Sequence, residues 1–228
     1  MSRPGPGTVA LVTGASRGLG YATAQALGAA GVQVVAMART VGGLEDLADA
    51  IEAAGGPTPT LAPLSITDDA GMQRLCRAIH ERWGRADLVV HCAAHAAPLT
   101  PADHIAAKDF DPSVEVNLRG TQRLIAMTAP LLAASGAGTF VHVTDDRAGG
   151  AFWGSYGATR AAGDALARSW AAETRRVGPR VALFQPRPMP TALRARFYPA
   201  EEAGSLTPCA EEAARLLALL SAEAPVAV

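Results

Sequence analysis

Two short segments of this chain carry residues that could do chemistry, and the first is a tyrosine with a nearby cation. Tyr156 and Arg160 stand four positions apart, which is the spacing that places two side chains on one face of a helix. A phenol has an ordinary pKa of roughly 10, and a neighbouring cation lowers that pKa enough to make the group a useful acid or base. The pair therefore predicts a proton-transferring tyrosine.

The second segment is glycine-rich and runs from Thr13 to Gly20. Glycine accepts a positive φ and lets the backbone approach a pyrophosphate closely, and the first turn of a following helix offers unpaired N–H groups. An apolar run precedes the glycines and helical spacing follows them, which is the context expected of a phosphate-binding turn. We expect the dinucleotide contacts here to be Gly14, Ser16, Arg17, Gly18, Leu19 and Gly20.

Two arginines indicate which dinucleotide is bound. Arg39 ends the second predicted strand, where NAD-preferring proteins usually place a carboxylate for the ribose hydroxyls. The segment 34–40 contains no acidic residue. Arg17 and Arg39 together suit a 2′-phosphate, so the sequence favours NADP(H) over NAD(H). The alternative is that both are solvated surface arginines.

The elements that must position these residues alternate along the chain. Apolar runs predict strands over 8–13, 32–38, 58–64, 86–92, 138–144 and 180–185. Helical spacing predicts helices over 18–30, 43–54, 109–134, 153–177 and 208–221. A further helix is predicted to begin at a cap on Asp68 or Asp69 and to run to Trp83. This alternation predicts one α/β domain over 1–228, with a doubly wound, Rossmann-like parallel sheet, helices on both faces and the ligand crevice at the carboxyl ends of the strands. The Pro-rich segment 187–207, with a short helix at 192–197, is expected to be a substrate-side lid.

Composition narrows the partners. A formal net charge of −1 at pH 7 gives no electrostatic reason to expect nucleic acid or an anionic membrane. The three cysteines lack disulfide-framework or metal-site spacing, so we expect reduced thiols, a cytoplasmic location and no metal. The N-terminus has no apolar signal core, and no apolar run of about 18 residues exists, so no membrane span is expected.

On these motifs the chain resembles the short-chain dehydrogenase/reductase family over nearly its whole length. The segment 13–20 matches the family's TGxxxGxG turn, Tyr156 matches its acid/base tyrosine, and Asn117 matches the helix asparagine that supports the active-site water chain. Arg160 replaces the lysine of the family's YxxxK motif. The resemblance implies hydride transfer between a nicotinamide and a carbonyl–alcohol pair, so the expected substrate is a small carbonyl compound or alcohol.

Other positions that the family uses are altered in this chain. Ser65 stands where the family usually has an aspartate that bonds the adenine, and His91-Cys92-Ala93-Ala94 falls on the family's NNAG segment and keeps only its alanine. Pro186-Arg187 replaces a Pro-Gly pair. The resemblance adds to the expected cofactor contacts Ser65, Ile66, Ala93, Tyr156, Arg160, Pro186, Met189 and Thr191.

The sequence leaves open which residue supplies the hydroxyl that polarises the substrate carbonyl. The family places a serine about a dozen residues before the tyrosine, and Thr144 could take that role here. If Asp145 takes the position instead, its carboxylate opposes a developing oxyanion and raises the pKa of the tyrosine. Asp145 could also pair with Arg147 or Arg160 and leave the site neutral. Because an arginine does not usefully shed a proton at neutral pH, we expect acid/base function that is weakened rather than abolished.

Three functional interpretations follow. The first is an NADP(H)-dependent oxidoreductase with an altered site, whose catalytic residues are Tyr156, Arg160, Asn117 and Thr144. The second is a catalytically impaired, regulatory nucleotide-binding homologue. The third is a non-redox lyase of the halohydrin dehalogenase type, a class that uses a tyrosine–arginine pair but fills the glycine turn with a bulky aromatic, whereas Gly18 is intact here.

The C-terminal segment bears on assembly. The family normally adds a seventh strand with a glycine-rich turn, which often helps to build a tetramer. Residues 222–228 lack those glycines. We therefore expect the seventh strand to be missing and a homodimer to be favoured, with a tetramer as the alternative.

Overall fold

Six parallel strands form the centre of the molecule. The computed structural model describes residues 4–221. The strands lie in the order β3-β2-β1-β4-β5-β6, and their bounds are β1 (Val9–Thr13), β2 (Gln33–Ala38), β3 (Thr60–Pro63), β4 (Leu88–His91), β5 (Thr139–Val143) and β6 (Arg180–Phe184). Most strand residues are buried, as a sheet covered on both faces requires.

The strand order reverses at β1. This strand pairs with β2 on one side and with β4 on the other, so the connections on either side of it leave in opposite directions. Such a switch point opens a crevice at the carboxyl ends of the strands. Thr13 at the end of β1 is in register with His91 at the end of β4, so the glycine turn and the segment 92–95 begin side by side.

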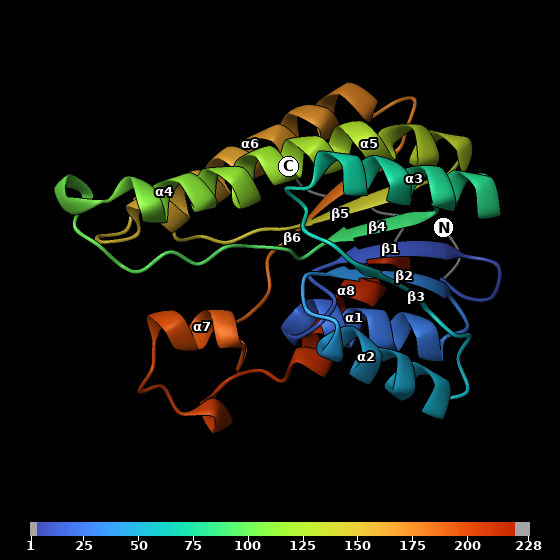
Figure 1. The fold of residues 1–228 in the computed structure, drawn as a ribbon, viewed down its shortest axis with the longest axis horizontal. Coiled ribbons are helices and arrows are strands. Elements are labelled where there is room, and N and C mark those ends of the chain that lie inside the picture. The colour runs from blue at the N-terminus through green and yellow to red at the C-terminus, as the bar shows by residue number, and fades with distance from the viewer. Residues whose placement is uncertain (1–3, 222–228) are drawn as a thin grey trace.

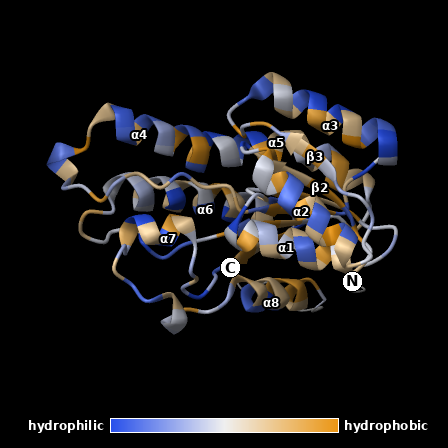
Figure 2. Cartoon of the chain, turned by 60° about the horizontal axis from the view of Figure 1, so that its bottom comes forward, coloured by the Kyte–Doolittle hydropathy of each residue, from blue (hydrophilic) through white to orange (hydrophobic). Residues whose placement is uncertain are grey.

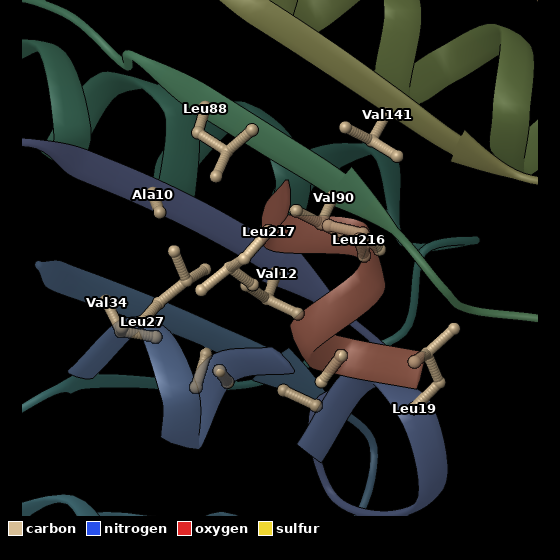
Figure 3. Close-up of a cluster of buried hydrophobic side chains, with 14 of the residues drawn as sticks. Ala10, Val12, Leu19, Leu27, Val34, Leu88, Val90, Val141, Leu216 and Leu217 are labelled. Carbon is tan, nitrogen blue, oxygen red and sulfur yellow. The ribbon is translucent and has the colours of Figure 1, made fainter. Parts of the chain in front are cut away.

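Two layers of helices cover the sheet (Figure 1). On one face lie α1 (Gly18–Ala29), α2 (Gly42–Ala53) and α8 (Cys209–Ser221), and on the other α3 (Asp69–Trp83), α4 (Ala107–Ser113), α5 (Gly120–Ala134) and α6 (Gly154–Thr174). In Figure 2 the strands are mainly hydrophobic, whereas the helices also carry hydrophilic residues. The layers are held by apolar contacts such as those of Leu216 and Leu217 with Val12, Val90 and Leu27 (Figure 3).

The helix predicted over 109–134 is found, but it is not a regular α-helix along its whole length. The helical backbone begins at Ala107 and contains a π-helical segment, Val114–Arg119, between α4 and α5. Hydrophobic periodicity does not reveal a widened turn, because the residues remain compatible with a helix. The widened turn holds Asn117, and π-helical turns frequently mark functional sites.

The remaining predicted strands and helices begin and end within three residues of their observed bounds. Helix α7 (Ala192–Phe197) has the predicted limits, and Thr191 caps it by accepting a hydrogen bond from the Arg194 amide at 3.1 Å. The segment 187–207 stands beside the sheet at its carboxyl edge (orange in Figure 1). The prediction of a missing seventh strand concerns 222–228, which lie outside the described residues. Within 4–221, no helix has both the length and the apolar character needed to cross a bilayer.

Candidate active site

A cavity of about 820 Å³ opens at the carboxyl ends of the strands. This volume lies within the range of roughly 300–1,000 Å³ that is typical of small-molecule and cofactor sites. Asn117 is the one predicted site residue that does not line the cavity. The predicted residues that do line it are Gly14, Ser16, Arg17, Gly18, Leu19, Gly20, Arg39, Ser65, Ile66, Ala93, Thr144, Tyr156, Arg160, Pro186, Met189 and Thr191.

The glycine turn has the geometry of a phosphate cradle. Gly14 and Gly18 have φ of 70° and 59°, conformations that other residues adopt with strain. A Cβ on Gly20 would lie 2.3 Å from the Gly14 carbonyl oxygen, so only glycine fits there. No side chain caps the start of α1, which leaves its first N–H groups available to an anion. These residues therefore fit a pyrophosphate.

Seven arginines line the cavity, and two of them, Arg187 and Arg215, are paired with one glutamate. Arg187 Nε donates to Glu212 Oε1 at 2.6 Å, and Arg215 Nη2 donates to Glu212 Oε2 at 2.7 Å. Although burial opposes its charge, these hydrogen bonds hold the pKa of Glu212 below its ordinary value. Arg17 and Arg39 are exposed, and neither has an acidic side chain within 4.0 Å in the described residues. They are therefore exposed cations that a ligand phosphate can reach.

The tyrosine predicted to move protons is buried beside a carboxylate. Tyr156 is 4% exposed, and its hydroxyl donates to Asp145 Oδ2 at 3.0 Å. Burial raises the pKa of Tyr156 above its ordinary value and Asp145 raises it further, whereas the charge of Arg160 lowers it. The net shift is upward, so the phenol keeps its proton at neutral pH and can act as a proton donor.

Thr144 faces a different partner. Its hydroxyl donates to Asp164 Oδ2, and its amide donates to the Phe184 carbonyl at 2.9 Å. Asp164 also accepts a hydrogen bond of 2.9 Å from His142 Nε2. Of the alternatives that the sequence left open, the geometry therefore puts the Asp145 carboxylate, and not the Thr144 hydroxyl, against the phenol.

Arg160 reaches inward from α6. It is 4% exposed, its Nη2 donates to the Val143 carbonyl, and its buried Nε has no hydrogen-bond partner in the described structure. Its charge lowers the pKa of Tyr156 and helps to lower that of Asp164. Arg160 thus supplies positive charge to the site, while part of its guanidinium is directed at the end of β5.

Asn117 links the loop after β4 to α6 through hydrogen bonds. Its Oδ1 accepts from the His95 amide at 2.8 Å, and its Nδ2 donates to the His95 carbonyl and to Thr159 Oγ1, both at 3.0 Å. Both amide hydrogens are therefore used within the protein. The arrangement ties the loop after β4 to α6, the helix that carries Tyr156.

A buried histidine, His91, extends this network at a position for which the sequence predicted no role. The Ala93 amide donates to Thr13 Oγ1 at 3.3 Å, and the Thr13 hydroxyl donates to His91 Nδ1 at 2.9 Å, because the other ring nitrogen of His91 is the donor. His91 Nε2 then donates to Thr121 Oγ1 at 3.0 Å, and Thr121 donates to the Asn117 carbonyl at 2.7 Å. Burial holds the pKa of His91 well below its ordinary value. A neutral His91 thus bridges β1 and the π-helical turn.

An aromatic wall completes the cavity on the side of α7. The ring centroids of Trp153 and Phe197 are 4.5 Å apart, and those of Tyr156 and Phe197 are 5.0 Å apart. Tyr198 packs on Trp153 at 6.2 Å. In residues 4–221, no group of three or more His, Cys, Asp or Glu side chains is placed to hold a metal ion.

Sequence reasoning missed Asp164 and Glu212. Asp164 follows Arg160 by four residues and Tyr156 by eight, so helical periodicity could have placed it on the same face. Glu212 pairs locally with Arg215, three residues on in α8, but its contact with Arg187 depends on the packing of α8 against the segment after β6.

Comparison with known proteins identifies relatives of this chain. The sequence model of a family described as "short chain dehydrogenase" matches residues 8–202. "Oxidoreductase asL5" of Sarocladium schorii is 31% identical over 189 residues, which are 82% of this chain and 74% of that protein. "D-threitol dehydrogenase" of Mycolicibacterium smegmatis is 31% identical over 142 residues, 62% of this chain and 54% of that protein. "Glycine betaine reductase ATRR" of Emericella nidulans is 32% identical over 80% of this chain, which spans only 14% of that longer protein.

Solved structures share the whole fold. One from Pseudomonas syringae, titled as a short chain dehydrogenase, is 30% identical with a TM-score of 0.92, over 99% of this chain and 93% of that one. Another, from Shigella flexneri 2a, is titled as a short chain dehydrogenase complexed with NADP; it is 26% identical with a TM-score of 0.91, over 99% of this chain and 95% of that one.

Proposed function

Since this chain belongs to the short-chain dehydrogenase family, whose sequence model matches residues 8–202, we propose that it is an NADP(H)-dependent oxidoreductase that interconverts a small carbonyl compound and its alcohol. The observation that carries the proposal is the buried phenol of Tyr156, which lines the same cavity as the glycine turn. A proton donor and a dinucleotide cradle in one cavity are what carbonyl reduction requires.

The choice of NADP(H) rests on charge. Arg17 and Arg39 line the cavity without an acidic partner in the described residues. A 2′-phosphate would accept charge-assisted hydrogen bonds from both guanidinium groups. The Shigella flexneri structure complexed with NADP supports the same preference.

The protein's part in the reaction is to hold and supply a proton. When bound, the reduced nicotinamide would supply a hydride to the carbonyl carbon. The electron pair of the C=O bond passes to oxygen, which takes the proton of Tyr156, so one carbonyl is reduced for each NADPH oxidised. Arg160 limits the cost of the resulting tyrosinate by its positive charge.

One observation favours the second interpretation, a nucleotide-binding protein with impaired catalysis. The hydroxyl of Tyr156 is engaged by the Asp145 carboxylate, so an oxyanion formed there meets negative charge. Under this interpretation the protein binds the dinucleotide but does not catalyse the reaction.

The test is a binding titration followed by an activity assay. We expect NADPH to bind more tightly than NADH by calorimetry, and Arg39→Asp to reverse that order. Arg175→Asp, an exposed site at the far end of α6, is the matched control.

We expect Tyr156→Phe to retain NADPH binding and to lose roughly 10²- to 10⁴-fold in turnover of a ketone and aldehyde panel. Unchanged turnover in this variant refutes the role of Tyr156, and tight binding without any turnover supports the impaired form.

Three further proposals come from the sequence: a homodimeric assembly, a cytoplasmic location and a substrate-side lid formed by 187–207. Light scattering of the purified protein tests the first. Protection of the 187–207 amides from hydrogen exchange on addition of NADP⁺ and an alcohol tests the third.

A further inference from the structure

We propose that the substrate carries a protonated amine on the carbon next to its carbonyl, so that its reduced form is a 1,2-amino alcohol, and that Asp145 binds the ammonium group. The inference rests on the proposed function and names its substrate class. It starts from the position of the Asp145 carboxylate, which lies where the substrate oxygen has to bind in order to take the proton of Tyr156.

The first step is geometric. Asp145 lines the cavity and its side chain is 27% exposed, so a ligand can reach it. Its Oδ2 lies 3.0 Å from the hydroxyl of Tyr156. Any substrate oxygen that is hydrogen-bonded to this phenol therefore lies close to the carboxylate.

The second step concerns charge. During reduction of a neutral ketone, negative charge develops on the substrate oxygen and faces Asp145, which disfavours the reaction. An ammonium group on the adjacent carbon lies between the two, donates to the carboxylate and offsets the developing charge. The carboxylate then favours binding of the correct substrate instead of opposing the chemistry.

The third step is that neighbouring cations compensate this charge only in part. The Arg147 amide donates to Asp145 Oδ1 at 3.2 Å, and Arg147 Nε forms a long ion pair with that oxygen at 3.8 Å while lying nearer to Asp146 Oδ1 at 3.6 Å. Both contacts fall on Oδ1, whereas the phenol faces Oδ2. Arg194 from α7 binds Glu201 through two hydrogen bonds of 2.5 and 2.7 Å. Arg160, from α6, donates to the Val143 carbonyl at the end of β5. The positive charge of Arg160 also helps to lower the pKa of Asp164, so it acts on a second carboxylate.

The fourth step is the aromatic wall beside Asp145. The guanidinium of Arg147 lies 5.4 Å from the ring centroid of Trp153 and 6.0 Å from that of Tyr198. Arginines occupy these π faces in this structure, with Arg194 also 4.6 Å from the Tyr198 centroid, so a substrate ammonium would replace Arg147 there. A ring face next to a carboxylate stabilises an organic cation more than a neutral group of the same size.

A matched substrate pair tests the inference. Aminoacetone and hydroxyacetone share a skeleton and differ in an ammonium against a hydroxyl group. We expect kcat/KM with NADPH to be at least about tenfold higher for aminoacetone, which corresponds to roughly 1.4 kcal/mol of transition-state discrimination. Calorimetry gives a readout that does not depend on turnover: 1-amino-2-propanol should bind to the NADP⁺-loaded protein more tightly than 1,2-propanediol.

The variants assign the preference to one carboxylate. We expect Asp145→Asn, which keeps the shape and removes the charge, and Asp145→Ser, which supplies a hydroxyl, to abolish both preferences and to improve the relative use of hydroxyacetone. Asp146→Asn removes an adjacent, more exposed carboxylate and should keep both preferences. Thermal unfolding of each variant identifies any that is misfolded, and the other Asp145 variant then gives the answer.

The outcomes separate the two proposals. Reduction of hydroxyacetone as fast as aminoacetone, or an amine preference that survives both Asp145 variants, overturns the inference and leaves the proposed function standing. NADPH binding without turnover of aminoacetone and without binding of the amino alcohol also overturns the inference. A failure to bind NADPH overturns the proposed function, and the inference falls with it.

Discussion

The Tyr156 hydroxyl donates a hydrogen bond of 3.0 Å to the Asp145 carboxylate, and this contact adds to burial in keeping the proton on the phenol. The carboxylate favours the neutral phenol, whereas Arg160 favours the phenolate. A site of this kind keeps its proton until a substrate displaces the carboxylate or neutralises it. The chemistry is therefore expected to depend on the charge of the substrate.

Removal of the Asp145 charge should lower the pKa of Tyr156. Burial is the largest cause of the raised pKa and persists in Asp145→Asn, but the contribution of the carboxylate is lost. Phenolate absorbance should therefore appear at lower pH in Asp145→Asn than in the native protein, measured as the difference from the same protein with Tyr156→Phe. Asp146→Asn should leave the titration unchanged. A Tyr156 pKa that stays the same or rises in Asp145→Asn would contradict the assignment.

Gly18 couples the phosphate turn to the segment before α7. Its φ is 59°, and a Cβ there would lie 3.2 Å from Thr191 Cγ2. Gly18→Ala should cost roughly 1–2 kcal/mol of unfolding free energy from the left-handed backbone alone, and the methyl contact adds to this. Thr191→Ser removes that methyl and keeps the hydroxyl that caps α7.

Urea unfolding of the two single variants and the double variant measures this coupling. The double variant should recover the contact part of the loss and retain the backbone part, so the two effects are not additive. Strictly additive losses would show that residues 18 and 191 do not touch.

Asp164 should be a major source of stability. It accepts hydrogen bonds from His142 and Thr144 and lies near the buried charge of Arg160. Asp164→Ala leaves these groups without a partner and should cost roughly 3–5 kcal/mol, measured by urea unfolding at neutral pH. Asp49→Ala on the exposed side of α2 should cost little.

The pH dependence of that loss has a definite sign. Burial raises the pKa of Asp164, but hydrogen bonds from His142 and Thr144 outweigh it, so the folded pKa lies below the ordinary value. The contribution is therefore complete above the unfolded pKa of about 3.9 and is lost as the pH falls through the folded pKa. The gap between native protein and Asp164→Ala should shrink in acid, and a gap that widens there would refute the assignment.

His91 should make the protein sensitive to mild acid. Burial depresses its folded pKa, so below about pH 6.5 the unfolded chain takes up a proton that the folded protein refuses. This group should lower the unfolding free energy by up to about 1.4 kcal/mol per pH unit. Urea unfolding across mildly acidic pH should show a shallower slope for His91→Gln than for the native protein. Exposed His80→Gln should not change the slope, and an equal slope for His91→Gln would exclude His91 as the cause.

The candidate site was predictable wherever local pattern carries the chemistry. The glycine turn needs only a strand, three glycines and a helix in succession, and Tyr156 with Arg160 needs only helical spacing. All the predicted residues except Asn117 line one cavity. The predicted helix at 192–197 was also found at its predicted limits, because Thr191 is a local capping signal.

The amino-acid sequence by itself determined the alternation of strands and helices, the phosphate turn and the family, because each depends on neighbours within a few residues along the chain. Tertiary structure decided which groups surround the phenol. Whether Thr144 or Asp145 faces Tyr156 depends on how the end of β5 sits against α6, and the pairing of Thr144 with Asp164 spans 20 residues. The pKa of Tyr156 follows from burial and from charges brought together through space, and no local pattern encodes either.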